Sequence, residues 1–417
     1  MKRQRLFTRN FTLLILGQVT SLIGNYSLKF ALSMYILEMT GSAAVFSGML
    51  ALSMVPTILL SPFGGILADR GNRRNIMVTL DTLSGIVVLS GMVCFREGWV
   101  LAAAGGILIV LSVLGAFESP TVQACVPQML SGDLLLKGNA AVSQVQALAA
   151  LFTPFLGSIF YTALGIRPVF AAVILCFFLT ACFECFIRLE PLRQREKKRG
   201  SAMIREEFSV SIHFLGKENT GVLKLLLLAA LVSLFVAGIL IVGFPYLVRT
   251  TLGLSAGHYG AAESAMGAAA ILGACGAGIL GDKLRTGHLY RLIAAGGGCL
   301  FLSGLAFLLP AGVVVKYLIL TAAFGGCQLF CNMFSIYALS VIQKLTPAQL
   351  TGKVMACVYT LSTCAQPLGQ LLYGGLFDRF SSAVAVVLIP SGLVVAAIGM
   401  AAAGFFRKTE QEIIRKP

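Results

Sequence analysis

Twelve long apolar segments, separated by mostly short polar loops, constrain this chain more than any other feature of its sequence. A helix needs about 20 consecutive apolar residues to cross the ~30 Å hydrocarbon core of a bilayer. Hydrophobic residues make up 57% of the 417 residues and charged residues only 12%, too little polar surface for a water-soluble protein. The sequence therefore predicts an all-α membrane protein. Its twelve predicted transmembrane helices are 11–37, 43–67, 75–95, 99–122, 139–163, 168–188, 222–247, 258–281, 290–310, 315–341, 353–376 and 382–406.

Lys and Arg residues gather in alternate loops. The net charge of +15 would suit a nucleic-acid-binding protein, but such a protein collects its basic residues on one folded face. If both termini are cytoplasmic, 26 of the 32 Lys and Arg residues lie on the cytoplasmic side and five lie outside. We therefore expect cytoplasmic termini and no nucleic-acid partner. The basic segment 1–9 precedes an apolar run too long for a signal peptide, which predicts that this run remains as the first span.

The sequence offers no metal site or enzyme motif. Most of the eleven cysteines lie inside apolar segments, and none shows metal-ligand spacing with the three His residues. The run Gly296-Gly-Gly298 lies inside a predicted span rather than in a strand-to-helix turn, so it is not a phosphate-binding loop. We expect no disulfide, no metal, no cofactor and no enzymatic activity.

Two pairs of landmarks recur at one offset. Asp69 and Asp282 follow the second and eighth spans and are 213 residues apart, and Pro154 and Pro367 are separated by the same distance. A repeat of six helices is how many secondary transporters are built. We predict two pseudo-symmetric six-helix bundles at 1–188 and 222–417, the second ending in a short cytoplasmic tail. The cytoplasmic linker 189–221 between them is predicted to contain an amphipathic helix, because apolar residues recur at helical spacing over 204–215.

Several short motifs resemble those of one transporter family. They are Gly65-Ile-Leu-Ala-Asp69-Arg70-Gly-Asn-Arg73-Arg74, Thr40-Gly41-Ser42-Ala43, Pro56, Asp81, Glu118-Ser-Pro120, Asn139-Ala140 and Thr153-Pro154-Phe-Leu-Gly157. The first is similar to the signature that the major facilitator superfamily carries between its second and third helices. Together the motifs resemble the macrolide-efflux branch of the drug–proton antiporters in that superfamily, over nearly the whole chain.

The resemblance implies a function. It suggests a monomeric secondary active transporter that exports amphiphilic small molecules, such as drugs or macrolides, by alternating access with proton antiport across a bacterial cytoplasmic membrane. The residues themselves leave two alternatives open. One is a transporter of a specific metabolite, siderophore or lipid, and the other is a non-transporting membrane receptor on the same fold.

Polar side chains form stripes on two spans that line the central cavity in this superfamily. At about 100° per residue, Gln18, Asn25 and Lys29 share one face of the first span. The tenth span carries a similar stripe, and the seventh has an apolar face suited to an amphiphilic ligand. Such stripes can equally pack helices together. The predicted substrate-binding cavity comprises Gln18, Asn25, Lys29, Phe235, Tyr246, Gln328 and Asn332.

Few carboxyl groups lie within the spans. We expect Glu263, Glu118 or Asp81 to carry the coupling proton, since a carboxyl group held away from water favours its protonated form. The alternative role is a structural ion pair. The sequence suggests that role for Glu184 with Arg188, and for Asp81 with the arginines that follow the second span.

The signature loop and its repeat suggest a gate on the cytoplasmic side. Its charges can bind across to the other bundle, and remaking such contacts would switch access by rocking the two bundles. The alternative is an ordinary surface charge cluster. The predicted gating residues are Gly65, Asp69, Arg70, Arg73, Arg74, Asp282, Lys283 and Arg285.

The fifth and eleventh spans carry matching polar stripes. In the family these helices meet across the two halves, so an interface role is favoured over substrate contact. The predicted interface residues are Gln146, Pro154, Gly157, Tyr359, Gln366 and Pro367.

Overall fold

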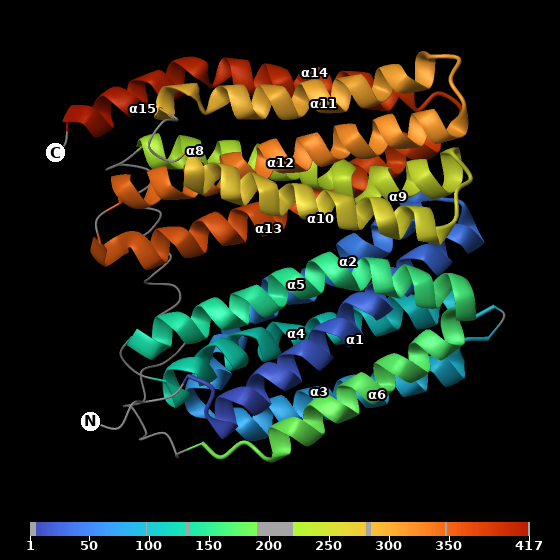
Figure 1. Cartoon of the computed structure of the whole chain (residues 1–417), viewed down its shortest axis with the longest axis vertical. Helices are drawn as coiled ribbons and strands as arrows, with labels where there is room; N and C mark the ends of the chain where they lie inside the picture. Colours follow the sequence, from blue (N-terminus) through green and yellow to red (C-terminus); the bar gives the residue numbers. More distant parts are fainter. Residues whose placement is uncertain are drawn as a thin grey trace. The chain divides into compact units, whose positions relative to one another are not determined.

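The computed structural model describes residues 6–96, 98–130, 133–189, 220–280, 285–346 and 348–415, and within these ranges every regular element is helical (Figure 1). Eleven of these helices are long and apolar enough to cross a membrane. Many large apolar side chains are exposed, among them Leu175 at 68% and Ile279 at 79%. Such exposure suits helices that face lipid, where an apolar surface carries no penalty.

Six helices account for the first six predicted spans. Most of them run longer than the apolar segments because a helix continues into the polar interface until a residue stops it. Gly41 and Gly165 adopt positive φ angles of 62° and 78°, and α1 and α5 end directly before them. The six helices are α1 (Arg9–Thr40), α2 (Ala43–Arg70), α3 (Arg73–Cys94), α4 (Val100–Met129), α5 (Asp133–Leu164) and α6 (Ile166–Cys185).

The seventh predicted span is one continuous helix of mixed geometry, called here the α8–η4 helix. It comprises α8 (Thr220–Val232), the π-helical turns η2 (Ser233–Ala237) and η3 (Ile239–Gly243), α9 (Phe244–Tyr246) and the π-helical η4 (Leu247–Thr251). The remaining elements are α10 (Ala256–Ile279), η5 (Thr286–His288), α11 (Tyr290–Leu308), α12 (Val313–Leu345), α13 (Ala348–Arg379), α14 (Ala385–Ala401) and α15 (Ala403–Arg415).

α13 covers the eleventh predicted span but is not among the eleven apolar helices. It is 32 residues long and its composition is more polar, with three Gln residues along its length. The helix is confirmed, while its crossing of the membrane stays a prediction.

The chain divides into two compact units. Unit 1 comprises Met1–Thr40, Leu52–Lys197 and Ser255–Ala261, and unit 2 comprises Gly41–Ala51, Lys198–Leu254 and Ala262–Pro417. The first residues of α2 thus pack with unit 2, and the first residues of α10 pack with unit 1. The bundle boundaries predicted at 188 and 222 stay a prediction, and the amphipathic helix predicted at 204–215 lies outside the described residues.

In unit 1, α1 packs on α5 and α6, and α3 packs on α4 and α6. One core cluster joins Phe11 and Leu14 of α1 to Met77 of α3 and to Val122 and Val126 of α4. These side chains are at most 2% exposed. Their mutual packing joins α1, α3 and α4 in one core.

In unit 2, α11 packs between α12 and α14. A Cβ atom added to Gly297 would lie 2.6 Å from the carbonyl oxygen of Gly392, so these glycines allow the α11 and α14 backbones to touch. α15 continues beyond the predicted twelfth span to Arg415, so the predicted tail is helical over its described residues. Phe406, at the end of that span, is fully buried and meets Phe334 of α12 edge-to-face. Asp378 of α13 caps α2 by accepting hydrogen bonds from the Ser42 hydroxyl and from the amide of Ala43 at 2.6 Å.

Candidate functional site

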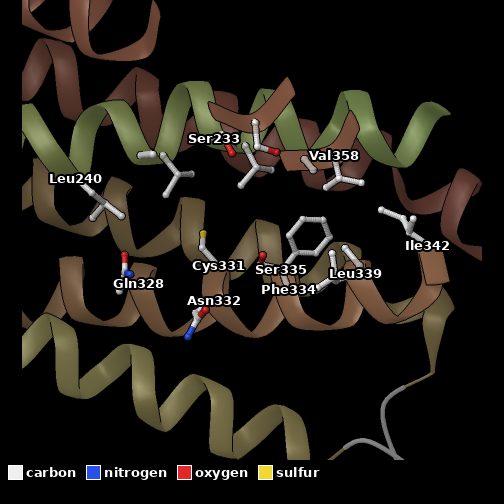
Figure 2. A pocket seen from close by; sticks show the side chains of 16 residues that line it. Ser233, Leu240, Gln328, Cys331, Asn332, Phe334, Ser335, Leu339, Ile342 and Val358 are labelled. Atoms are coloured by element: carbon white, nitrogen blue, oxygen red, sulfur yellow. The ribbon is translucent and has the colours of Figure 1, made fainter. Parts of the chain in front are cut away.

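A cavity of about 270 Å³ lies within unit 2. Three helices form it: the α8–η4 helix, α12 and α13. Figure 2 shows Ser233 and Leu240 across the cavity from Gln328 and Ser335. The lining residues are Ala229, Val232, Ser233, Val236, Ala237, Leu240, Gln328, Cys331, Asn332, Phe334, Ser335, Ala338, Leu339, Ile342, Val358 and Ser362.

The wall that the α8–η4 helix contributes to the cavity includes its π-helical turns. A π turn closes i→i+5 hydrogen bonds, so it is wider than an α turn. At Gly238, between η2 and η3, a Cβ atom would lie 2.6 Å from the carbonyl carbon of Gly369 on α13. This close backbone approach holds α13 against the α8–η4 helix beside the cavity.

Polar side chains from all three helices line this mainly apolar cavity, among them two amide residues of α12. Asn332 donates a hydrogen bond of 2.5 Å from its Nδ2 to the carbonyl oxygen of Ala270 on α10, which holds its side chain in place. Gln328 lies one turn away and also lines the cavity, as does Cys331. An apolar pocket with a few placed polar groups is the usual form of a small-molecule site.

The two aromatic residues predicted for the cavity are not among its lining residues. Phe235 is half-buried, and Tyr246 is buried with its ring 5.5 Å from that of Phe377. The sequence argument chose the face of this helix that carries its aromatic residues, whereas the face packed toward α12 and α13 is the one with Ala229, Val236 and Leu240. Val236 and Leu240 occupy the wall instead, and substrate contact by Phe235 and Tyr246 stays a prediction.

The predicted stripe on α1 belongs to unit 1. Gln18 is buried, Asn25 is half-buried and Lys29 is exposed. Whether these residues share a cavity with Gln328 and Asn332 stays a prediction, because each unit is described by itself.

Three acidic side chains from three helices of unit 1 come together beside α1. The Ser21 hydroxyl lies 3.2 Å from Oδ1 of Asp81 and 3.1 Å from Oε1 of Glu118. Glu184 of α6 lies within hydrogen-bonding reach of Asp81. We call Asp81, Glu118, Glu184 and Ser21 the carboxyl cluster. Sequence reasoning selected the first two but not their proximity, and Glu263 is a half-buried residue of unit 2, apart from this cluster.

The ion pairs suggested by the sequence are replaced by other contacts. Both carboxylate oxygens of Glu184 are buried without a hydrogen-bond donor, while the backbone of Arg188 pairs with the Asn10 side chain. Asp81 lies two turns beyond the signature arginines along α3, so its carboxyl group meets Ser21 and Glu184 instead.

Two arginines of the signature loop, Arg73 and Arg74, form hydrogen bonds to other helices of unit 1. Arg73 donates to the carbonyl oxygens of Ala68 on α2 and Ala124 on α4, both at 2.8 Å, and to Gln128 at 3.1 Å. Arg74 donates to the carbonyl oxygen of Cys185 on α6. These contacts tie the end of α2 to α4, and the start of α3 to the end of α6.

The other predicted gating residues lie in different surroundings. Arg70 and Arg285 are exposed, and a Cβ atom at Gly65 would meet open space. Gly64 makes the close approach instead, to the backbone of Ala116 on α4. The side chain of Asp69, and all of Asp282 and Lys283, lie outside the described residues. Gating across the two bundles stays a prediction.

The predicted interface residues occupy two separate packing contacts. On α5, Gly157 faces Phe30 of α1, and the carbonyl oxygen of Pro154 would lie 2.9 Å from a Cβ atom on Gly260 of α10. On α13, Pro367 is buried next to the Gly369 contact described above. Gln146 and Gln366 are half-buried, and Tyr359 is 70% exposed. An interface role for these residues stays a prediction.

Comparison with known proteins shows which family has this sequence and architecture. The family model described as Major Facilitator Superfamily matches residues 14–370. The chain is 24% identical over 371 residues to "Macrolide efflux protein A" of Streptococcus pyogenes, covering 87% of this chain and 88% of that protein. It is 29% identical over 255 residues to "Multidrug resistance protein MdtG" of Dickeya zeae, covering 58% and 56% of the two chains.

Solved structures with the same fold include a bacterial homologue of the iron transporter ferroportin in an inward-facing state. It superposes with a TM-score of 0.72 at 18% identity, over 96% of this chain and 98% of that one. A bacterial metal transporter gives a TM-score of 0.64 at 17% identity, over 97% and 99% of the two chains. At these identities the likeness concerns the fold alone. The helical architecture and the family match over residues 14–370 together show that this chain belongs to the major facilitator superfamily, whose members are multi-pass membrane transporters.

Proposed function

We propose that this protein exports amphiphilic small molecules, of the drug or macrolide class, by alternating access coupled to proton antiport. The observation that carries the proposal is the cavity of unit 2, which has apolar walls and two amide side chains. Amphiphilic compounds bury their apolar surface against such walls and use a few hydrogen bonds for orientation. Similarity to macrolide and multidrug efflux proteins supports export rather than import.

Proton coupling is supported by the carboxyl cluster of unit 1. Proton-coupled transport needs a group that binds and releases a proton inside the membrane, where ionisable residues are rare and functional. Asp81 and Glu118 meet this requirement by position, since both lie inside candidate membrane spans.

The test uses purified protein in liposomes with an imposed proton gradient. We expect flux of a macrolide or a lipophilic cation dye that collapses when an uncoupler is added. Flux that ignores the gradient would contradict proton antiport. Absence of flux for every compound, from protein shown to be folded, would contradict the proposed substrate class.

A matched pair of variants connects the flux to the cavity. Gln328→Leu removes a cavity amide, and we expect the substrate to bind about 2- to 10-fold more weakly, as for the loss of one hydrogen bond. Gln343→Leu is the control, because Gln343 lies on the same helix, is exposed and is not among the lining residues. If the two substitutions weaken binding equally, the substrate does not bind in this cavity.

A further inference from the structure

The hydroxyl group of Ser21 has more acceptors than it can serve. It carries a single hydrogen, yet carboxylate oxygens of Asp81 and Glu118 both lie within 3.2 Å of it. If both carboxyl groups were ionised, one oxygen would face the lone pairs of the hydroxyl without a hydrogen between them. The arrangement is satisfied when one carboxyl group is protonated and donates to the Ser21 oxygen.

A second proton is required at Glu184. Its side chain is fully buried, as is that of Asp81, and its two carboxylate oxygens have no hydrogen-bond donor. Oδ2 of Asp81 is buried and unpartnered as well. Since the two carboxyl groups lie within hydrogen-bonding reach, a proton shared between them satisfies both. Leaving both ionised would hold two like charges side by side in an interior that offers them little solvation.

No cation in the described part of the chain compensates these charges. The charged or titratable groups nearby are Arg73, which is bound to backbone carbonyls and Gln128, and the thiol of Cys125 on α4. None of the hydrogen bonds and electrostatic contacts of the three carboxyl groups involves Lys or Arg. Within that same part of the chain, no group of three His, Cys, Asp or Glu side chains has an arrangement that could hold a metal ion.

We infer that the carboxyl cluster is a proton-binding site of unit 1 that holds two protons. It is loaded through Glu118, which donates one proton to Ser21, and it stores the other proton between Asp81 and Glu184. Glu118 is the entrance because it is half-buried, whereas the other two acids are fully buried. The role of this site in transport rests on the proposed function, but proton binding itself does not.

The transfer through Ser21 conserves every atom. Glu118 takes a proton from a hydronium ion, which leaves as water, and donates it to the Ser21 oxygen, while Ser21 passes its own hydrogen to Oδ1 of Asp81. Ser21 ends unchanged, Glu118 is again a carboxylate and Asp81 is neutral. Once the proton on Asp81 moves from Oδ1 to Oδ2, Asp81 can donate it to Glu184. When the cluster loses its protons, the carboxylates on α3, α4 and α6 repel one another. Ser21 lies on α1 between Gln18 and Asn25, so this repulsion acts beside the predicted substrate stripe.

The first experiment measures protonated carboxyl groups directly. Infrared spectra of the purified protein in detergent, taken at mildly acidic and mildly alkaline pH, report the carbonyl stretch of protonated carboxyls. We expect a band that disappears on raising the pH, and that is lost or reduced by at least half in Glu184→Gln and in Glu118→Gln. Glu38→Gln is the matched control, since Glu38 is an exposed residue of α1 outside the cluster. A band unchanged in both cluster variants would overturn the inference.

The second experiment tests the relay and does not depend on acidic variants that fold poorly. Ser21→Ala keeps all three carboxyl groups but removes the bridge. We expect it to retain the infrared band and to slow proton release after a pH jump by about 100-fold, a modest factor for a positioned proton-transfer group. Ser27→Ala on the same helix is the control. Unchanged proton-release kinetics in Ser21→Ala would overturn the relay. If adding Na⁺ or Mn²⁺ at constant pH releases protons, the cluster binds a metal cation and the inference of a proton-binding site is overturned.

The outcomes separate this inference from the proposed function. A titrating cluster together with flux that ignores the gradient would leave the proton site standing and refute proton antiport. Gradient-driven flux together with a cluster that holds no proton would refute the site, and would leave Glu263 as the candidate for coupling.

Discussion

Arg73 shows how much a single side chain of the signature loop can organise. Its guanidinium group donates to three acceptors on two helices: the backbone carbonyls of Ala68 on α2 and Ala124 on α4, and the side-chain oxygen of Gln128 on α4. We expect Arg73→Ala to lower the stability of the protein by about 2 kcal/mol, because hydrogen bonds from a charged donor are lost and the carbonyls are left unpaired.

The measurement is thermal unfolding in detergent, with Arg70→Ala as the comparison from the same loop. Arg70 is exposed, so its removal should lower the melting temperature less. Equal losses in the two variants would mean that the loop arginines act through charge alone, not through the contacts of Arg73.

Cys331 provides a chemical probe of the cavity. Its thiol lines the cavity, while Cys327, one turn earlier on α12, is fully buried. We expect a small maleimide to modify Cys331 faster than Cys327, and a transported compound to protect Cys331. Peptide mapping after brief labelling reads both positions in one sample. Modification of Cys331 at the same rate with and without a saturating compound would contradict binding in this cavity.

At the scale of elements, the contact between α13 and the α8–η4 helix depends on Gly369. A Cβ atom there would overlap the carbonyl oxygen of Leu234 in η2. We expect Gly369→Ala to lower stability by about 1–3 kcal/mol, the usual cost of overpacking, and to weaken substrate binding by displacing a cavity wall.

The control for this prediction lies two turns further along α13. A Cβ atom at Gly375 meets open space, so Gly375→Ala should be neutral or slightly stabilising in the same helix. Thermal unfolding of the two variants checks the prediction. A smaller loss in Gly369→Ala than in Gly375→Ala would show that the two helices separate easily.

At the scale of the whole molecule, α13 decides the topology. Eleven crossings would place the two termini on opposite sides of the membrane, and twelve would place them on the same side. The distribution of Lys and Arg favours both termini inside. We expect a reporter that works only in the cytoplasm to be active when fused to either end of the chain. Activity at one terminus alone would show that α13 does not cross.

Much of the helical architecture could be predicted from the sequence, because the length of an apolar run is a local property measured against a fixed bilayer thickness. The choice of cavity residues could not. Val236 and Leu240 line the cavity of unit 2 and Phe235 and Tyr246 do not, because the face that a helix turns to its neighbours is set by packing between distant segments. The helix predicted as the eleventh span is present as α13, and its three Gln residues make it more polar than the others, so its crossing of the membrane stays a prediction.

The sequence by itself determined that this protein is a helical membrane protein with a repeated signature, and it selected Asp81, Glu118, Gln328 and Asn332 as polar groups worth examining. Only the tertiary structure decided which of them meet. Ser21 is 60 residues from Asp81 and 97 from Glu118, and their contact depends on the rotation of each helix about its own axis. Hydropathy does not encode that rotation, because it is set by the packing of side chains between helices, such as Gly64 against Ala116 and the core around Phe11.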